Sequence, residues 1–475
     1  MATPVYKMKK QKHRNSFSGS IGFVLAAAGS AVGLGNIWRF PYLAAKDGGG
    51  LFLVIYLVLA FTFGFALLTT EIAIGRKTKQ SPLTAYGKIH KKCKFLGVIA
   101  SLVPVIIMPY YCVIGGWVVK YFLAYLMGEG SRAATDGYFA NYIAEEQQPV
   151  ALMTVFLVIV VVIVIRGVNK GIESFSKVLM PILLLLVVGI SIFSLTIQHT
   201  DEAGVTRTGL EGFLIYVIPN FEGLTLKGFF TVLVDAMGQL FFSLSVAMGI
   251  MIAYGSYVKD DANMVKAINQ IEIFDSVVAF LAGVMIIPAV YTFMGKEGMA
   301  AHGPGLMFVS LPKIFDSMGK AGDLMGCLFF AMVLFAALTS AVSIMEAVVA
   351  SFMDKFHMSR LKATVIETVI ALVGAILVCL GYNKLYFNIK LPNGSEAQIL
   401  DIMDYISNNC LMPIVAIGTC ILIGWITKPS LVIDEAEKTG CKFSRKKLYI
   451  VMIRYIAPIL LVILFLKSMG ILTVI

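Results

Sequence analysis

Long apolar stretches alternate with short polar loops along the whole chain, and each stretch is about as long as a membrane-crossing helix. A helix that crosses the hydrocarbon core of a bilayer needs about 20 mostly apolar residues. By that measure the pattern predicts an all-α membrane protein with about eleven transmembrane helices, the last of which could instead be re-entrant. The expected spans are 21–45, 51–73, 95–126, 149–165, 175–197, 229–255, 271–294, 325–352, 362–381, 402–426 and 447–470.

Composition supports this prediction. The chain has 475 residues, of which 58% are hydrophobic and 14% charged. Soluble globular chains have roughly 45–50% apolar and about 25% charged residues, so much of this chain must lie in lipid. The net charge of +11 does not indicate nucleic-acid binding, because the basic residues gather in short loops between apolar segments. We therefore expect a lipid bilayer, and no nucleic acid, as the surroundings.

The distribution of loop charges predicts the orientation. The segment before the first span has several lysines and no acid, and so does the loop between the second and third spans. The loops 127–148 and 198–228 on the other side are mixed or acidic. The positive-inside rule then places the N-terminus in the cytoplasm, and an odd number of spans places the C-terminus outside. The expected location is the cell membrane.

Two spans are interrupted by glycine and polar residues at mid-membrane. The first reads GSAVGLGNIWRFPY over 29–42, and the sixth reads GQLFFSLSVAMGIM over 238–251. Glycine in a single membrane helix is commonly a close-packing site. If the chain consists of two repeats of five spans, the two breaks stand at matching positions and indicate instead a binding site near the membrane midplane.

Charged and hydroxyl side chains inside the spans are the candidate functional residues. Charge within a membrane is costly and points to function, although each of these residues could also mark a helix end or an interface. Adjacent hydroxyls at Thr339 and Ser340 could bond back to carbonyls of their own helix, or coordinate a small hard cation with carbonyls of a broken helix. The charged candidates are Arg39, Glu71, Asp275 and Glu346.

A series of motifs along almost the whole chain resembles the neurotransmitter:sodium symporter family, in its prokaryotic amino-acid transporter branch. The motifs are AVGLGNIWRFPY in the first span, GGG at 48–50, TEIAIGR at 70–76, YYCVIGGW at 110–117, RGVNKGIESFSKVLMP at 166–181, GQLFFSLS at 238–245 and ALTSAVSIME at 337–346. The resemblance implies a LeuT-type fold, which is a 5+5 inverted repeat with broken spans 1 and 6, in a bacterial inner membrane.

This resemblance also implies a division of the chain. The expected parts are 1–20 as a cytoplasmic segment, 21–197 as the first five-helix repeat, 198–228 as an extracellular loop, 229–427 as the second repeat, and 428–475 as a cytoplasmic loop with the final helix.

Two sodium sites are implied at matching positions. One would use carbonyls and hydroxyls of Gly29, Val32, Ala336, Thr339 and Ser340. The other would use Ala31, Asn36, Ser243 and Asp275 together with the substrate carboxylate, which would make ion and substrate binding mutually dependent.

The implied substrate site lies between the broken spans. Its residues would be Ser30, Ala31, Leu34, Gly35, Ile107, Tyr111, Phe242, Ser243, Ser245, Met248, Ser340 and Ile344, with Ile114 as a further part of the side-chain lining. This lining is apolar and favours a neutral, hydrophobic side chain. Gly33 stands where amine carriers of the family have an aspartate, which favours an amino acid. The carboxylate of Asp275 predicts independence of chloride.

Gating residues are implied by the resemblance as well. Arg39 and Asp404 would pair on the outer side and Arg14 and Asp354 on the inner side, while Glu71 would hold the broken backbone of spans 1 and 6.

The predicted function is sodium-coupled import of a neutral, hydrophobic amino acid by alternating access. An amino-acid sensor on the same scaffold, or a carrier of an amine or osmolyte, stays open. A channel would not account for two broken spans. An enzyme is not favoured, because no nucleophile–base pairing is visible and the histidines lie in loops or tails at positions 13, 90, 199, 302 and 357. The amino acid, the ion stoichiometry and the oligomeric state are left undecided.

Overall fold

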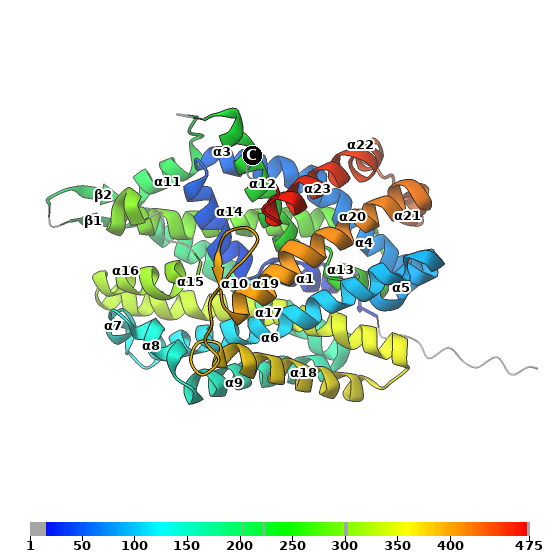
Figure 1. Ribbon diagram of the computed structural model, residues 1–475. Helices are drawn as coiled ribbons and strands as arrows, with labels where there is room; N and C mark the ends of the chain where they lie inside the picture. Colours follow the sequence, from blue (N-terminus) through cyan, green and yellow to red (C-terminus); the bar gives the residue numbers. More distant parts are fainter. Residues whose placement is uncertain (1–15, 202, 222–223, 299–302, 473–475) are drawn as a thin grey trace, which may run out of the picture.

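The protein is a bundle of long helices that run in both directions through a slab-shaped molecule (Figure 1). This computed structural model describes residues 16–201, 203–221, 224–298 and 303–472. We call the end that carries Phe17 the inner end, and the end that carries the β1–β2 hairpin the outer end, following the orientation that the loop charges predict. The long helices connect these two ends.

The first half of the chain forms five membrane-crossing units. The first is broken and the second contains a π-helical turn, as does the start of the fifth. In order, the units are α1 (Ser20–Ala31) with the turn Gly35–Arg39 and α2 (Phe40–Lys46); α3 (Gly50–Leu59) with the turn Ala60–Gly64 and α4 (Phe65–Thr78); α6 (Lys94–Leu126); α9 (Gln147–Ile165); and the turn Val168–Glu173 with α10 (Ser174–Thr196).

The second half begins with another broken unit and ends with a sixth, additional crossing. The units are α12 (Leu226–Ser243) and α13 (Ile250–Ser256); α14 (Met264–Gly298); α17 (Lys320–Phe356); α18 (Arg360–Leu380); α19 (Ile399–Asp404) with the turn Tyr405–Leu411, α20 (Met412–Ile421) and the turn Leu422–Ile426; and α22 (Lys446–Val451) with the turn Met452–Ile456 and α23 (Ala457–Ser468).

Short elements fill the connections at both ends. At the inner end are α5 (Pro82–Ile89), the 3-10 turn Lys91–Cys93 and α21 (Ser430–Glu437). At the outer end are α7 (Gly130–Ala133), α8 (Tyr138–Ala144), α11 (Gly209–Val217), α15 (Gly303–Gly305), the turn Leu306–Ser310 and α16 (Leu311–Ser317). Two antiparallel hairpins join them, β1 (Gln198–Thr200) with β2 (Thr206–Thr208) and β3 (Ile389–Lys390) with β4 (Glu396–Ala397).

The number of spans differs slightly from the eleven predicted. Among the described residues, nine helices are long and apolar enough to cross a membrane, and the bent pair α1 and α2 makes ten. The expected sixth span at 229–255 is present as α12 and α13, which residues 244–249 separate, and this pair is not counted by length and composition. Several helices also run past their predicted ends, as α14 and α17 do, because a helix need not stop where the hydrocarbon ends.

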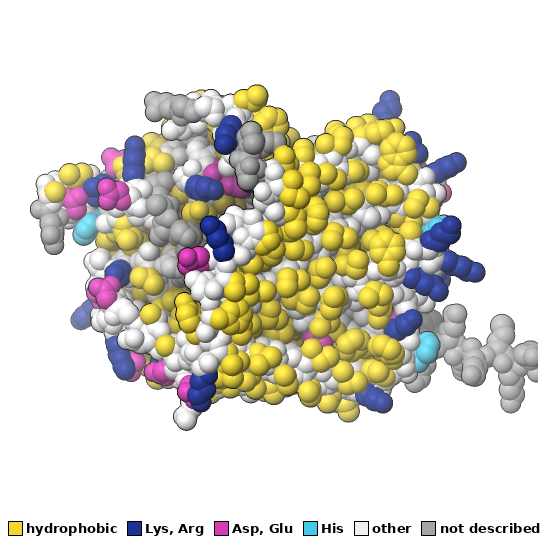
Figure 2. Space-filling model, viewed as in Figure 1, with side chains coloured by type: hydrophobic (Ala, Val, Ile, Leu, Met, Phe, Trp, Pro, Cys, Tyr) yellow, Lys and Arg dark blue, Asp and Glu magenta, His cyan; other side chains and the backbone are white. Residues whose placement is uncertain are grey.

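The broken helices form the centre of the bundle and apolar side chains cover its outside. Residues 26–37 and 244–258 are almost all buried, and α1 packs against α10, α14 and α17. Large apolar residues on α9, α10, α18 and α23 are exposed instead. Figure 2 shows a broad hydrophobic band on one side of the molecule, with Lys and Arg gathered beyond one end of it. This is the surface expected of a protein surrounded by lipid.

Candidate functional site

The first broken helix changes direction at Val32–Leu34. Its two halves meet at an angle of 51°, and Gly33 donates its N–H to the carbonyl of Ala31 over 3.0 Å instead of one turn back. Gly33 also has no room for a side chain, because a Cβ there would lie 2.6 Å from Ser340 Oγ. Peptide groups in and beside the break are therefore available to ligands at mid-membrane.

The second break, Leu244–Gly249, is longer. Three of its residues have positive φ, namely Ser245 at 52°, Ala247 at 62° and Gly249 at 74°. Glu71 of α4 holds this segment in place, since its Oε1 accepts the N–H of Ala247 over 2.6 Å. The predicted contact with the sixth span is therefore present. No hydrogen bond joins Glu71 to the break in the first span within the described part of the chain.

One small pocket between the two breaks contains all twelve residues predicted for the substrate site. Its volume is about 20 Å³, which is room for about one water molecule. Gly33 and Asn36 complete its lining. The predicted twelve are Ser30, Ala31, Leu34, Gly35, Ile107, Tyr111, Phe242, Ser243, Ser245, Met248, Ser340 and Ile344. The structure thus brings them together, while their roles as ligands remain predictions.

Two positions on α6 refine this lining. Ile114, which was expected in the side-chain lining, instead lines a separate outer cavity, because it lies two turns of α6 beyond Ile107. The hydroxyl of Tyr111 is buried beside Ser340 and the backbone of Leu34, but its geometry toward them does not make a full hydrogen bond. A buried hydroxyl without a partner is costly, so it is a free donor for a bound polar group.

A buried carboxylate lies beside the pocket. Asp275 of α14 is fully buried, and its Oδ1 accepts Asn36 Nδ2 over 2.8 Å and Ser243 Oγ over 2.7 Å. Tyr56 of α3 donates to Oδ2 over 3.1 Å. No described basic residue forms an ion pair with Asp275. Neutral hydrogen bonds alone leave a buried carboxylate charge uncompensated, and a cluster of carboxylate, amide and hydroxyl oxygens is the donor set that a hard cation prefers.

The second predicted ion site joins α1 and α17. Ser340 Oγ lies 3.1 Å from the carbonyl of Ser30 and 3.4 Å from that of Gly29. Thr339 Oγ1 donates back to the carbonyls of Phe335 and Ala336, as its helix allows. The backbones are close here, since a Cβ on Gly29 would lie 3.3 Å from Thr339 Cβ. The back-bond considered from the sequence is present at Thr339, and Ser340 contacts carbonyls of the broken first helix, while cation binding by these hydroxyls stays a prediction.

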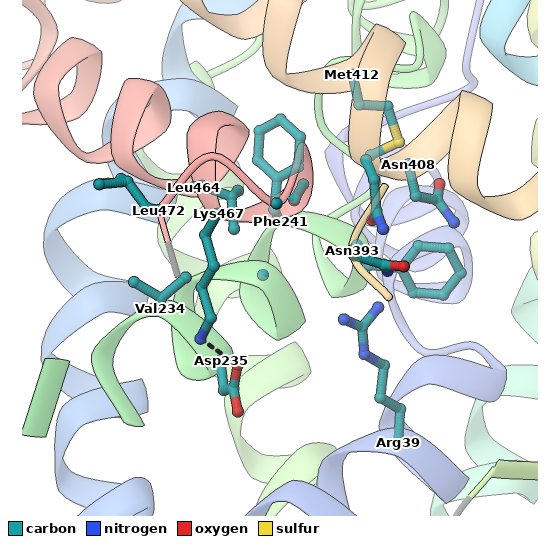
Figure 3. Close-up of a pocket in the computed structure, with 15 residues that line it drawn as sticks. Arg39, Val234, Asp235, Phe241, Asn393, Asn408, Met412, Leu464, Lys467 and Leu472 are labelled. Carbon is teal, nitrogen blue, oxygen red and sulfur yellow. Dashed lines mark hydrogen bonds and ion pairs between the residues drawn. The ribbon is translucent and has the colours of Figure 1, made fainter. Parts of the chain in front are cut away.

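Two larger cavities lie on the outer side of the pocket. One of about 410 Å³ contains Arg39, whose guanidinium points toward Asn393, and Lys467, which meets Asp235 over 3.2 Å (Figure 3). Another of about 340 Å³ is lined by both Arg39 and Asp404. Phe242 lines all three spaces and Tyr111 lines two of them. These two rings therefore separate the central pocket from the outer cavities.

The predicted outer pair is not in contact. No ion pair within 4.0 Å joins Arg39 and Asp404 in the described chain, and Asp404 accepts instead from Tyr110 over 3.1 Å and Asn408 Nδ2 over 2.6 Å. Both residues line the cavity of about 340 Å³.

Aromatic packing and hydrogen bonds join the segments that meet at the described inner end, beside a cavity of about 170 Å³. Phe17 donates its N–H to the carbonyl of Tyr257 over 3.2 Å, and its ring packs edge-on against Tyr254. Tyr257 in turn donates to Glu346 over 2.6 Å. Asp354 accepts the N–H of Ser81 over 2.6 Å. Its predicted partner Arg14 lies outside the described residues.

Sequence reasoning missed some contributors. Tyr56 lies in a plainly apolar span, and only its position about two turns after the GGG segment could have drawn attention to it. Arg360 pairs with the buried Glu346 over 2.6 Å, although it begins the next helix. Arg76 and Glu272 are also buried, paired with Glu435 and Arg445 of the loop around α21 and α22. Such pairs are difficult to predict from the sequence, because a charged residue near a helix end looks ordinary when its partner lies in a distant loop.

Comparison with known proteins finds a match over almost the whole chain. The model of the sodium:neurotransmitter symporter family matches residues 14–131 and 132–474. An uncharacterized sodium-dependent transporter of Haemophilus influenzae is 31% identical, over 96% of this chain and 99% of its own. The uncharacterized sodium-dependent transporter YhdH of Bacillus subtilis is 33% identical, over 96% and 98%. The human sodium- and chloride-dependent GABA transporter 2 is 27% identical, over 91% and 77%.

A solved structure agrees with this match. The crystal structure of MhsT in complex with L-phenylalanine superposes with a TM-score of 0.83 and 35% identity, over 96% of this chain and 100% of MhsT. MhsT has the LeuT-type fold, so the predicted fold class is confirmed.

Proposed function

Because the chain belongs to the sodium:neurotransmitter symporter family, we propose that it couples the inward movement of sodium to import of a neutral, hydrophobic amino acid. It is a multi-pass membrane protein and a sodium-dependent transporter of that family. The substrate class, the number of sodium ions, the independence of chloride and the orientation in the membrane are parts of the proposal.

The observation that carries the proposal is the environment of Asp275. Its carboxylate lies against the pocket wall with Asn36, Ser243 and Tyr56 as neutral partners. A sodium ion beside Asn36 and Ser243 would neutralise this charge, and the carboxylate of a bound amino acid would complete its coordination. Binding of either then favours binding of the other, which is the coupling a symporter requires.

The pocket supports an amino-acid substrate. Tyr111 offers a free hydroxyl donor, and the N–H groups of Leu34 and Gly35 lie at the start of a helical segment, where anions bind well. Ile107, Met248 and Ile344 surround the rest of the space with apolar side chains. A neutral hydrophobic side chain fits such a lining, whereas a charged one would be buried without a partner.

A fixed carboxylate also supports independence of chloride. A sodium ion and a zwitterion bring net positive charge into the membrane, which needs a nearby anion. Asp275 supplies this charge from the protein, and a dissolved chloride ion is then unnecessary.

The arrangement of cavities supports alternating access. Two cavities open from the outer end toward Phe242 and Tyr111, while Phe17, Tyr254 and Tyr257 pack the inner end. In the proposed cycle, substrate enters from the outer side, Arg39 and Asp404 approach each other above it, and the inner packing then opens.

Equilibrium binding tests the proposal. Purified protein is titrated with labelled neutral amino acids in sodium chloride, sodium gluconate and potassium chloride. We expect saturable binding of at least one hydrophobic amino acid in both sodium salts and none in potassium. Binding that is equal in sodium and potassium, or absent in gluconate, would contradict the sodium or the chloride part respectively.

A further inference from the structure

A group of unpaired lysines lies at the inner corner where α5 is followed by α6. Lys91 and Lys92 form the 3-10 turn between these helices, and Lys94 is the first residue of α6. All three are exposed, and none forms an ion pair with a described residue. The sequence has no acidic residue between Glu71 and Glu129, so no acid within the α5–α6 segment itself offsets these charges.

An apolar stripe begins directly beside these lysines. Phe95, Val98 and Leu102 of α6 are 56%, 55% and 44% exposed, at spacings that place them on one face of the helix. Figure 2 shows Lys and Arg side chains beyond the end of the hydrophobic band, in the region where Figure 1 places α5. The positively charged patch therefore adjoins the apolar stripe in the same order in which the head group of a lipid adjoins its acyl chains.

The lysines do not serve the helix itself. The N-terminal end of a helix is positive, so basic side chains there are unfavourable. Helix α6 has no acid in its first turn and no side-chain cap at Cys93 that would offset them. Because the three lysines are exposed, they also do not stabilise the fold by packing against other helices. The positive-inside rule explains why lysines occur in this loop, and their exposure directly beside an apolar stripe leaves them free to bind a negatively charged partner.

We propose that this corner, Lys91–Phe95, binds the head group of an anionic phospholipid of the inner leaflet. The phosphodiester oxygens lie among the ammonium groups of Lys91, Lys92 and Lys94. The acyl chains lie along Phe95, Val98 and Leu102. Polybasic segments at the membrane border bind anionic lipids with a strength that grows with each lysine.

The bound lipid also bears on the inner end of the transport path, a step that rests on the proposed function. The N–H of Ser81, just before α5, is held by Asp354 over 2.6 Å. Pro82 of α5 lies against Gly249, where a Cβ would come within 2.6 Å of its ring. A lipid that fixes the α5–α6 corner therefore stabilises α5 against α13 and α17, and with them the closed inner end.

The test compares two triple variants in nanodiscs of phosphatidylcholine with and without phosphatidylglycerol. One variant is K91Q/K92Q/K94Q. The control is K428Q/K442Q/K447Q, which removes the same charge from exposed lysines elsewhere at the inner end. Native mass spectrometry measures retained phosphatidylglycerol. The corner variant should lose roughly a hundredfold in affinity, and K92Q alone about fivefold, while the control stays within about twofold of the parent.

Thermal unfolding in pure phosphatidylcholine checks that all variants fold alike. Phosphatidylglycerol should raise the unfolding temperature of the parent and of the control, and should leave the corner variant unchanged. Equal loss of lipid in both triple variants would show only a general attraction of the charged end and would overturn the proposal. Competition by glycerol phosphate as strong as by the lipid would overturn the role of the apolar stripe. Because lipid retention is measured without substrate or sodium, it succeeds or fails independently of the proposed transport.

Discussion

At the scale of single residues, the sequence identified most of the central pocket. All twelve residues that the family resemblance implied for the substrate site line one space. The glycine and hydroxyl pattern by itself indicated only the two breaks, since irregular backbone within a membrane lines a cavity. Tyr56 was not predicted, because a tyrosine in an apolar span looks like any other large side chain until Asp275 is placed beside it. Ile114 was predicted to line the central pocket but lines an outer cavity, because it lies further along α6 than Ile107 and Tyr111.

Replacement of Asp275 by serine should make the protein depend on chloride. The substitution removes the fixed charge and leaves donors from Asn36, Ser243 and Tyr56 around a small space, where a chloride ion can bind. In gluconate we expect sodium affinity, measured by sodium-dependent substrate binding, to fall by more than about a hundredfold. In chloride much of it should return. A variant with equal binding in both salts would show that Asp275 does not supply the needed charge.

Ala247→Gly should stabilise the protein. Ala247 has φ of 62°, a conformation that costs a residue with Cβ roughly 1 kcal/mol and glycine nothing comparable. We expect a higher thermal unfolding temperature in detergent. Ala253→Gly within α13 is the matched control and should lower the unfolding temperature, since glycine is unfavourable in a helix. If both substitutions acted in the same direction, the strain assigned to the break would be absent.

At the scale of elements, the hydrophobic pattern predicted the helices better than their ends or their breaks. The breaks in spans 1 and 6 were expected from glycine and serine, but their lengths were not, and the second separates α12 from α13 completely. The observed ends differ from the predicted ones because helices such as α14 extend beyond the apolar run by which they are recognised in the sequence. Pairs that fasten one element to another, such as Glu346 with Arg360, depend on loop paths that no local pattern encodes.

Removal of Arg360 should destabilise the junction of α17 and α18. Its guanidinium makes two contacts with the buried Glu346, at 2.6 and 2.8 Å. Arg360→Gln leaves that carboxylate with Tyr257 as its remaining partner, and breaking a buried pair costs about 3–5 kcal/mol. The double variant E346Q/R360Q should recover part of the loss in a thermal unfolding assay. A double variant less stable than R360Q would contradict this account of the pair.

The outer end should carry a pH dependence from Asp47, which follows α2 in the loop before α3. Burial, and then the nearby charge of Asp235, raise the pKa of Asp47 to about 6. Because this folded-state pKa exceeds the usual 3.8, the protonated form stabilises the fold, and that stability is lost as pH rises from about 4 through 6. Asp47→Asn should remove this part of the decline in unfolding temperature. A parent and variant with parallel pH profiles would refute it.

At the scale of the whole molecule, the outer end has more open space than the inner end, where a cavity of about 170 Å³ lies beside Phe17. Cavities of about 410 and 340 Å³ lie outside Phe242 and Tyr111, whereas the central pocket has only about 20 Å³. In the proposed transport cycle, α1, α12 and their neighbours therefore move apart around the breaks to admit the substrate. The two gates are expected from the family resemblance, because the charges of each pair look like an ordinary surface ion pair in the sequence. Which proposed gate is closed depends on the packing of all the helices together.

The measurement that tests the central claim most directly is accumulation in proteoliposomes. Purified protein is reconstituted, and labelled hydrophobic amino acid is supplied under an inward sodium gradient, with potassium as the control. We predict accumulation above the outside concentration that persists in gluconate and collapses when an ionophore dissipates the sodium gradient. Saturable sodium-dependent binding without accumulation would contradict the account and identify the protein as a sensor on a transporter scaffold.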